Sequence, residues 1–257
     1  MSERANQSAP SQAQEQLEEL IVIPARYQSS RLPGKPLVDI AGKPMLVRTA
    51  ERCFEVKPRE SVLVATDDDR IAEVCEDNDI RYIMTEDHPT GTDRVAEVAS
   101  RIKSKTYINV QGDEPVFNPQ DLVLLSEEAR KDPSLTYIGY CDMPQWQWND
   151  TKYTRLLFGL EKNLIYIGRG PMPFGHAGEF SFSYRQVCLH AYPADALAKF
   201  HAIEGKTPIE AVEDHEMMRF LELGLRVKVL PMSDESMPVD RQSDVPLVET
   251  RIAELGL

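Results

Sequence analysis

The chain has 257 residues, of which 42% are hydrophobic, and a formal net charge of −13 at pH 7. This length and apolar content allow one large domain with a substantial core. The acidic balance argues against nonspecific binding to nucleic acids or anionic membranes, because most of the surface would repel a phosphate-rich partner.

The amino-terminal residues 1–18 are polar and lack the apolar centre of a signal peptide. We therefore expect a disordered leader on a cytoplasmic protein. The apolar runs elsewhere are short and interrupted by charged residues, which predicts that no segment crosses a membrane. The four cysteines lie far apart without CxxC spacing, and we interpret them as reduced packing residues.

The first predicted element is a buried strand over residues 20–25, because the run LIVIPA is short, apolar and rich in β-branched residues. A helix is predicted over 44–55, after a long loop that contains glycine and proline. The alternation continues with strands over 61–67, 81–85 and 106–115 and helices over 69–79 and 92–102. This order predicts an α/β fold with a mainly parallel sheet, whose ligands bind beyond the carboxyl ends of the strands.

Positive charge gathers in the loop after the first predicted strand. Residues 24–48 contain five cationic side chains and one carboxylate, namely Arg26, Arg31, Lys35, Lys43, Arg48 and Asp39. Cationic side chains and the backbone N–H groups of a glycine-containing loop bind phosphate. The loop matches neither GxxxxGK[ST] nor GxGxxG, so it predicts a phosphate site of a different nucleotide fold. A solvated basic loop is the alternative interpretation.

The predicted strand over 106–115 contains the segment NVQGDEP. Gln111 carries an amide donor and acceptor suited to the edge of a base, and Asp113 is a hard oxygen ligand suited to Mg²⁺. Asp67 and Asp68 form a second acidic pair at the end of an earlier strand. Such a pair more often caps a helix than binds a metal.

Four segments together resemble the 3-deoxy-manno-octulosonate (Kdo) cytidylyltransferase family, the CMP-Kdo synthetases. They are IPARYQSSRLPGKPL, VATDDDRI, TGTDRVAEVA and NVQGDEP, in the order and spacing of the family. The resemblance implies a Rossmann-like nucleotidyltransferase core with a smaller inserted β-rich dimerisation region, which we place around 135–190 of a single domain over 19–257. It also implies a Mg²⁺-dependent homodimer that transfers CMP from CTP to the hydroxyl of an anionic sugar acid, releasing pyrophosphate, for envelope or capsular polysaccharide synthesis.

The resemblance also carries roles to individual residues. Catalytic roles fall to Arg26, Lys35, Asp113 and Asp240, and the two aspartates would be the metal ligands. CTP would be bound by Arg26, Ser29, Arg31, Lys35, Thr90, Gly91, Asp93 and Gln111, with Arg94 in support. The sugar-acid acceptor would be contacted by Arg169, Gln186, His190 and Glu216.

The acceptor half departs from the family pattern. Gln186 stands in place of a His, His190 in place of a Tyr, and Met217 in place of the Gln of a Glu-Gln pair that begins with Glu216. His190 and His215 are candidate acceptor contacts or satisfied interior histidines, and for His215, on an amphipathic helix, the second interpretation is favoured. A site that pairs polar groups of its ligand discriminates against mismatched ligands. Kdo, another 2-keto-3-deoxy sugar acid, a nonulosonic acid and a phosphonate therefore stay open as acceptors.

Two other classes of protein remain as alternatives. A nucleotide-sugar-binding glycosyltransferase would use an acidic metal motif at a strand end, of which residues 67–69 are a weak version. A non-catalytic nucleotide-binding protein would have no evident need for a cationic loop facing Asp113 and Asp240. Use of CTP with release of pyrophosphate distinguishes a cytidylyltransferase from both.

Overall fold

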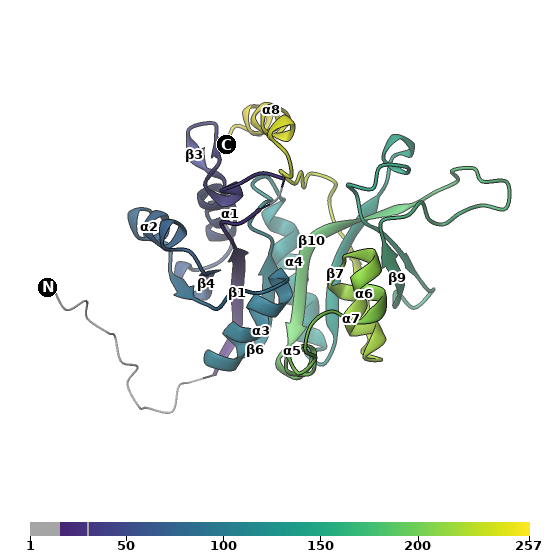
Figure 1. Cartoon of the computed structure of the whole chain (residues 1–257), viewed down its shortest axis with the longest axis horizontal. Coiled ribbons are helices and arrows are strands. Elements are labelled where there is room, and N and C mark those ends of the chain that lie inside the picture. Colours follow the sequence, from purple (N-terminus) through teal and green to yellow (C-terminus); the bar gives the residue numbers. More distant parts are fainter. Residues whose placement is uncertain (1–15, 30) are drawn as a thin grey trace, which may run out of the picture.

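A central sheet of mainly parallel strands forms the middle layer of the computed structural model, which describes residues 16–29 and 31–257 (Figure 1). Along the sheet the strands follow the order β11, β7, β10, β6, β1, β4 and β5. Their bounds in that order are Val227–Pro231, Thr136–Asp142, Tyr184–Pro193, Ser104–Val110, Leu17–Ala25, Val62–Thr66 and Tyr82–Met84. Of these seven, β10 alone runs antiparallel to its neighbours. The carboxyl ends of the other six therefore meet at one edge.

Helices cover both faces of this sheet (Figure 1). The helices are α1 Met45–Phe54, α2 Asp69–Asp77, α3 Gly91–Arg101, α4 Pro119–Lys131, α5 Ala194–His201, α6 Pro208–Glu213, α7 Met217–Glu222 and α8 Val245–Leu255, and the last of these packs beside the two-stranded sheet instead. Ile21 and Ile23 of β1 pack with α1, α2 and α4, whereas Leu20 and Val22 pack with α3, α5 and α7. An apolar run whose alternate residues fill two cores is a strand buried on both faces. The buried strand expected over 20–25 is thus confirmed.

Polar caps set where several helices begin. Asp68 precedes α2, Thr90 precedes α3 and Asn118 precedes α4, and each side chain accepts a hydrogen bond from an N–H of the first turn. The caps place α2 and α3 close to the ranges expected from the sequence, whereas α4 had no expected range. They also confirm the capping interpretation for Asp68. Short elements complete the chain: a two-stranded sheet of β2 Asp39–Ile40 and β3 Lys43–Pro44, and the 3₁₀ helices η1 Lys35–Leu37, η2 Arg59–Ser61, η3 Gln145–Gln147 and η4 Gln242–Asp244.

A β-rich extension lies between β7 and β10. It contains the antiparallel strands β8 Arg155–Phe158 and β9 Leu164–Gly168, and β8 pairs with β10. The segments between β7 and β10 project from the right-hand end of the molecule in Figure 1. The insertion expected around 135–190 was too wide, because β7 and β10 themselves belong to the central sheet.

The amino-terminal expectation also needs correction. β1 begins at Leu17, so the expected leader over 1–18 is too long, and residues 1–15 lie outside the described part of the chain. Within the described ranges, no helix combines the length and the apolar character that a bilayer span requires. All four cysteines are unpaired, as expected.

Candidate active site

A cavity of about 340 Å³ opens at the carboxyl ends of β1 and β6 and is bounded on its other side by β10. Among the described residues, its lining contains eight cationic side chains and five carboxylates. They are Arg26, Arg31, Lys35, Arg94, Lys152, Arg169, Arg185 and Lys206, and Asp113, Glu114, Asp214, Glu216 and Asp240. An excess of positive charge thus lines the cavity of a chain whose net charge is −13. Such a field favours an anionic ligand.

The basic loop after β1 is closed by Gly34. Its N–H donates to the carbonyl oxygen of Tyr27 at 3.0 Å, and its φ is 68°. A Cβ at this position would lie 3.2 Å from the ring of Tyr27, so both the left-handed backbone conformation and the tight contact favour glycine. Lys35 follows directly, as the first residue of η1. The loop residues that were expected to bind the triphosphate all line the cavity, namely Arg26, Ser29, Arg31 and Lys35.

Lys35 joins two carboxylates from distant parts of the chain. Its Nζ lies 2.5 Å from Oδ2 of Asp113 and 3.0 Å from Oδ1 of Asp240. Nη1 of Arg31 is 3.7 Å from the same oxygen of Asp240. The N–H of Val239 donates to the carbonyl oxygen of Asp113 at 3.1 Å, which holds the two acidic segments together. We expected catalytic roles for Asp113, which follows β6, and for Asp240, near the carboxyl terminus. The structure brings both together at Lys35.

The charges of this cluster hold one another in their ionised forms. Burial alone would lower the pKa of Lys35, but the charges of Asp113 and Asp240 outweigh it and raise that pKa above its usual value. Burial would likewise raise the pKa of Asp240, and the attraction of Lys35 reverses the shift and lowers it. The cluster thus keeps a fixed positive and negative charge at neutral pH.

The donor set at Asp113 and Asp240 fits a divalent cation. Both carboxylates converge on one cationic group, and Oδ1 of Asp113 is buried without a hydrogen-bond partner in the described structure. In residues 16–29 and 31–257 no three His, Cys, Asp or Glu side chains form a metal-binding group. A cation here would take its other ligands from substrate oxygens and water, as Mg²⁺ does in nucleotide sites.

The end of β6 supplies amide groups to the cavity. Gln111 lines it, as expected, and Gly112 lets the chain pass close to β1, because a Cβ there would lie 3.1 Å from the carbonyl oxygen of Pro24. Asn109 was missed by the sequence analysis. Its buried side chain also lines the cavity, and neither amide atom has a partner among the described residues. Unpaired buried amides are costly, so Asn109 is a further candidate ligand contact.

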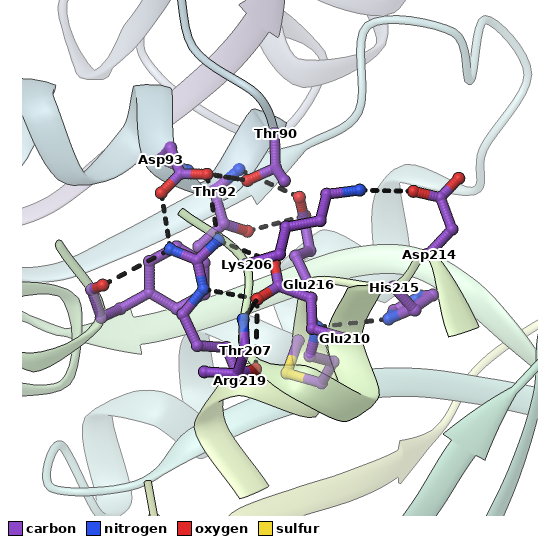
Figure 2. Close-up of polar contacts among 12 residues, drawn as sticks. Thr90, Thr92, Asp93, Lys206, Thr207, Glu210, Asp214, His215, Glu216 and Arg219 are labelled. Carbon is purple, nitrogen blue, oxygen red and sulfur yellow. Dashed lines mark hydrogen bonds and ion pairs between the residues drawn. The ribbon is translucent and has the colours of Figure 1, made fainter. Parts of the chain in front are cut away.

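Thr90 and Gly91 line the cavity at the start of α3, but Asp93 does not. The carboxylate of Asp93 is buried behind the wall, where Oδ1 pairs with Nη1 of Arg219 at 2.7 Å and Oδ2 accepts from the hydroxyl of Thr90 at 2.6 Å (Figure 2). Glu210 pairs with the same guanidinium at 2.7 Å. Asp93 was expected to contact CTP directly. Instead its carboxylate holds the hydroxyl of Thr90, which lines the cavity.

On the acceptor side, Arg169, Gln186 and Glu216 line the cavity, as expected. His190 does not, because Gln186 stands in front of it, with Nε2 of the amide 2.7 Å from Nε2 of the imidazole. His215 does line the cavity, and its Nε2 lies 2.6 Å from Oε1 of Gln186. Burial lowers the pKa of both imidazoles to about 3, so both are neutral at pH 7.

Five charged residues of the lining were missed by the sequence analysis: Glu114, Lys152, Arg185, Lys206 and Asp214. Burial, with the charge of Asp113 adding to it, raises the pKa of Glu114 to about 7. Lys152 and Lys206 belong to loops and reach the cavity only through the fold, so their surroundings in the sequence gave no signal. Glu114 stands beside Asp113 within the NVQGDEP segment, and that position was the signal available for it.

The other acidic pair is occupied by structural contacts. Asp67 pairs with Arg94 at 3.1 Å, and Asp68 caps α2 and pairs with Arg70 at 2.7 Å. These contacts occupy two of the three carboxylates in the weak glycosyltransferase metal motif at residues 67–69.

Comparison with known proteins gives one consistent result. A sequence model of a family described as Cytidylyltransferase matches residues 20–227. The 3-deoxy-manno-octulosonate cytidylyltransferase of Escherichia coli is 33% identical over 237 residues, which cover 91% of this chain and 96% of that protein. The 8-amino-3,8-dideoxy-manno-octulosonate cytidylyltransferase of Shewanella sediminis is 32% identical, with 91% and 98% covered.

A solved structure agrees with these relatives. It is a CMP:2-keto-3-deoxy-manno-octonic acid synthetase in complex with CTP, with a TM-score of 0.85 and 33% identity. The match covers 93% of this chain and 99% of that one. The α/β fold with a mainly parallel sheet is therefore shared over nearly the whole length of both chains.

Proposed function

Since the chain belongs to the 3-deoxy-manno-octulosonate cytidylyltransferase family, we propose that it transfers CMP from CTP to a Kdo-type sugar acid, with release of pyrophosphate. The observation that carries this proposal is the Lys35 ammonium between Asp113 and Asp240 in a cavity lined by excess positive charge. A triphosphate needs cations, and a metal-bridged triphosphate also needs carboxylates beside them.

The reaction joins the acceptor to the nucleotide by one displacement. The anomeric hydroxyl oxygen of the sugar acid forms a bond to the α-phosphorus of CTP, and the bond from that phosphorus to the β-bridging oxygen breaks. Pyrophosphate leaves with the electron pair, and the hydroxyl proton passes to water. The protein's part in such a step is to position the reactants and stabilise charge.

Four residues of the basic loop would hold the triphosphate: Arg26, Ser29, Arg31 and Lys35. Lys35 is the most buried of the charged ones, with 15% of its side chain exposed, against 52% for Arg31. Two of the three N–H donors of its ammonium bind Asp113 and Asp240, which leaves the third for an oxygen on which charge develops as pyrophosphate leaves. Gln111, Thr90 and Gly91 would contact the cytidine.

Asp113 and Asp240 would hold Mg²⁺ together with oxygens of the substrates. Bound there, Mg²⁺ would neutralise phosphate charge and lower the pKa of the acceptor hydroxyl. The unpartnered buried Oδ1 of Asp113 supports this assignment.

Arg169, Gln186 and Glu216 would contact the acceptor. Nη1 of Arg169 donates to the carbonyl oxygen of Thr151 at 3.2 Å, so its planar guanidinium is held beside the cavity. A guanidinium suits the carboxylate of a sugar acid, because it can bind both oxygens at once. The other two side chains are suited to sugar hydroxyls.

The assembly and location of the enzyme complete the proposal. Trp146, Phe174 and Phe182 of the β-rich extension are 70%, 69% and 52% exposed. Exposed aromatic groups of this kind mark a protein interface, which supports a homodimer. We propose that the enzyme is cytoplasmic and that its CMP-sugar product serves envelope or capsular polysaccharide synthesis.

The test is steady-state release of pyrophosphate with Mg²⁺. CTP is compared with ATP, GTP and UTP, and Kdo with 8-amino-Kdo, a nonulosonic acid and a small phosphonate. We expect release with CTP and a Kdo-type acid that needs both substrates. Release with another acceptor alone would change the substrate assignment, and none with any pair would refute the proposed function.

A further inference from the structure

Six side chains form an unbroken series of hydrogen bonds that begins and ends in the cavity wall. In order they are His215, Gln186, His190, Tyr192, Thr92 and Glu216, hereafter the polar chain. The successive distances are 2.6, 2.7, 2.9, 3.0 and 2.6 Å. His215, Gln186 and Glu216 line the cavity, whereas His190, Tyr192 and Thr92 lie buried behind it. The two ends are adjacent in the sequence.

The direction of the polar chain is fixed from the His215 end. The backbone N–H of Met217 can only donate, and it lies 3.2 Å from Nδ1 of His215. A neutral His215 therefore carries its proton on Nε2 and donates it to Oε1 of Gln186. This turns the NH₂ group of Gln186 toward Nε2 of His190, which must then be the unprotonated nitrogen.

When Glu216 is ionised, its end of the polar chain requires the same direction. A carboxylate only accepts, so the hydroxyl of Thr92 donates to Oε1 of Glu216, and the N–H of Thr92 donates to Oε2 at 3.2 Å (Figure 2). Because the Thr92 hydroxyl already donates its one proton to Glu216, it can only accept from the hydroxyl of Tyr192. Tyr192 in turn accepts from Nδ1–H of His190. Both ends thus assign the same proton to the same nitrogen of His190.

We propose that His190 and His215 are positioning residues whose tautomers, fixed by the polar chain, hold Gln186 and Glu216 in one orientation toward the acceptor. Oε1 of Gln186 accepts from His215, and one amide hydrogen of Gln186 is donated to His190. The second amide hydrogen of Gln186 can therefore be donated to a ligand. Glu216 keeps lone pairs on both oxygens for acceptor hydroxyls. The site therefore selects a sugar acid that accepts a hydrogen bond at Gln186 and donates at Glu216.

The alternative tautomer would break this pattern. If His190 carried its proton on Nε2, two N–H groups would face each other across 2.7 Å. Rotating the Gln186 amide would relieve that clash but would set its NH₂ against the donating Nε2 of His215. His215 cannot move its proton to Nδ1, because the N–H of Met217 occupies that nitrogen. One arrangement alone leaves every group paired, and an unpaired buried group is costly.

The first test reads the tautomers directly and does not depend on activity. The full chain is labelled with ¹⁵N-histidine, and long-range ¹H–¹⁵N correlation spectra are recorded at pH 7. Peaks are assigned by their loss in H190N and H215N variants. We expect His215 protonated on Nε2 and His190 protonated on Nδ1, both neutral. His190 protonated on Nε2, or either imidazole charged, would overturn the proposal.

The second test rests on the proposed function and separates positioning from packing. Tyr192→Phe removes one hydroxyl from the middle of the polar chain and keeps the ring, which stacks on Phe220. We expect the KM for the sugar-acid acceptor to rise about tenfold and the KM for CTP to change less than twofold. Tyr107→Phe is the matched control, since Tyr107 is equally buried, pairs with Tyr192 across the strands, and bonds outside the polar chain.

The outcomes distinguish this proposal from the proposed function. An unchanged acceptor KM in Tyr192→Phe, or an equal rise in Tyr107→Phe, would overturn the positioning role while leaving cytidylyl transfer intact. If no acceptor supports turnover in the wild type, the proposed function fails, and the tautomers of His190 and His215 still decide whether the polar chain exists.

Discussion

Lys35 and Asp240 stand 205 positions apart in the sequence, and their side chains form an ion pair of 3.0 Å in the cavity wall. The pair joins the basic loop after β1 to the segment that precedes α8. Asp113, at the end of β6, completes the cluster with a 2.5 Å contact to the same ammonium. An acidic chain thereby concentrates charged groups of both signs at the place where we propose that a nucleotide and a metal bind.

Replacing Lys35 with Ala should lower kcat about a hundredfold or more, because it removes a preorganised positive charge that stabilises leaving pyrophosphate. The measurement is pyrophosphate release at saturating CTP and acceptor. Lys43→Ala is the matched control, since Lys43 pairs with Glu51 on the exposed surface. Near-normal turnover of Lys35→Ala would remove the basic loop from the mechanism.

Asp240→Asn should preserve the fold and raise the Mg²⁺ concentration needed for half-maximal activity by at least about tenfold, because an amide oxygen is a much weaker ligand than a carboxylate. Activity is followed across a Mg²⁺ titration. Asp79→Asn makes the same exchange at a turn with φ of 53°, a conformation that Asn tolerates. An unchanged titration curve for Asp240→Asn would mean that the second metal ligand is another residue.

Glu114 should make stability depend on pH. Its pKa is about 7 when folded, against an ordinary value of 4.5. At a pH between 4.5 and about 7, Glu114 is protonated in the folded chain and ionised in the unfolded chain. The free energy of unfolding therefore falls as the pH rises through this range. Glu114→Gln removes the titrating carboxyl and with it this dependence on pH.

We therefore expect the free energy of unfolding of Glu114→Gln, minus that of wild type, to increase between pH 5 and pH 8. The increase should be on the order of 3 kcal/mol. Urea unfolding without added metal at pH 5, 6.5 and 8 measures it, and taking the difference cancels the contributions of other groups, including His190 and His215. A difference that is the same at all three values would contradict the raised pKa.

Arg219→Met should lower the free energy of unfolding by about 3–5 kcal/mol, because it leaves the carboxylates of Asp93 and Glu210 buried without their partner. Urea unfolding measures the loss. Arg251→Met is the control, as Arg251 pairs with Glu254 at the surface and such pairs contribute about 1 kcal/mol or less. A loss below about 1 kcal/mol in Arg219→Met would show that the buried network is dispensable.

The first half of the fold follows from local patterns. The run around β1 is apolar on both faces, and Thr90 and Asp68 mark helix starts, so strands and helices up to β6 were predicted close to their observed bounds. The basic loop and NVQGDEP are contiguous motifs, which is why Lys35 and Asp113 were found. The expected insertion was too wide because it included β7 and β10. Their sequences resemble those of inserted strands, and only their pairing within the central sheet distinguishes them.

The acceptor wall was less predictable because tertiary contacts build it. His190 was expected in the cavity, but the side chain of Gln186, four residues earlier on β10, covers it. Asp93 was expected near the nucleotide, but Arg219, 126 positions later, takes its carboxylate. Lys152 and Lys206 reach the cavity from loops that no local motif marks. Charge and residue type alone do not reveal such pairings.

The most direct test of cytidylyl transfer is a ³¹P NMR time course of the protein with CTP, Mg²⁺ and Kdo. We expect the resonances of CTP to decline while a CMP-sugar phosphodiester and pyrophosphate appear in equal amounts, and only when the acceptor is present. Conversion of CTP to free CMP or CDP without a phosphodiester resonance would contradict the account, since it would make the cavity a site of hydrolysis instead of transfer.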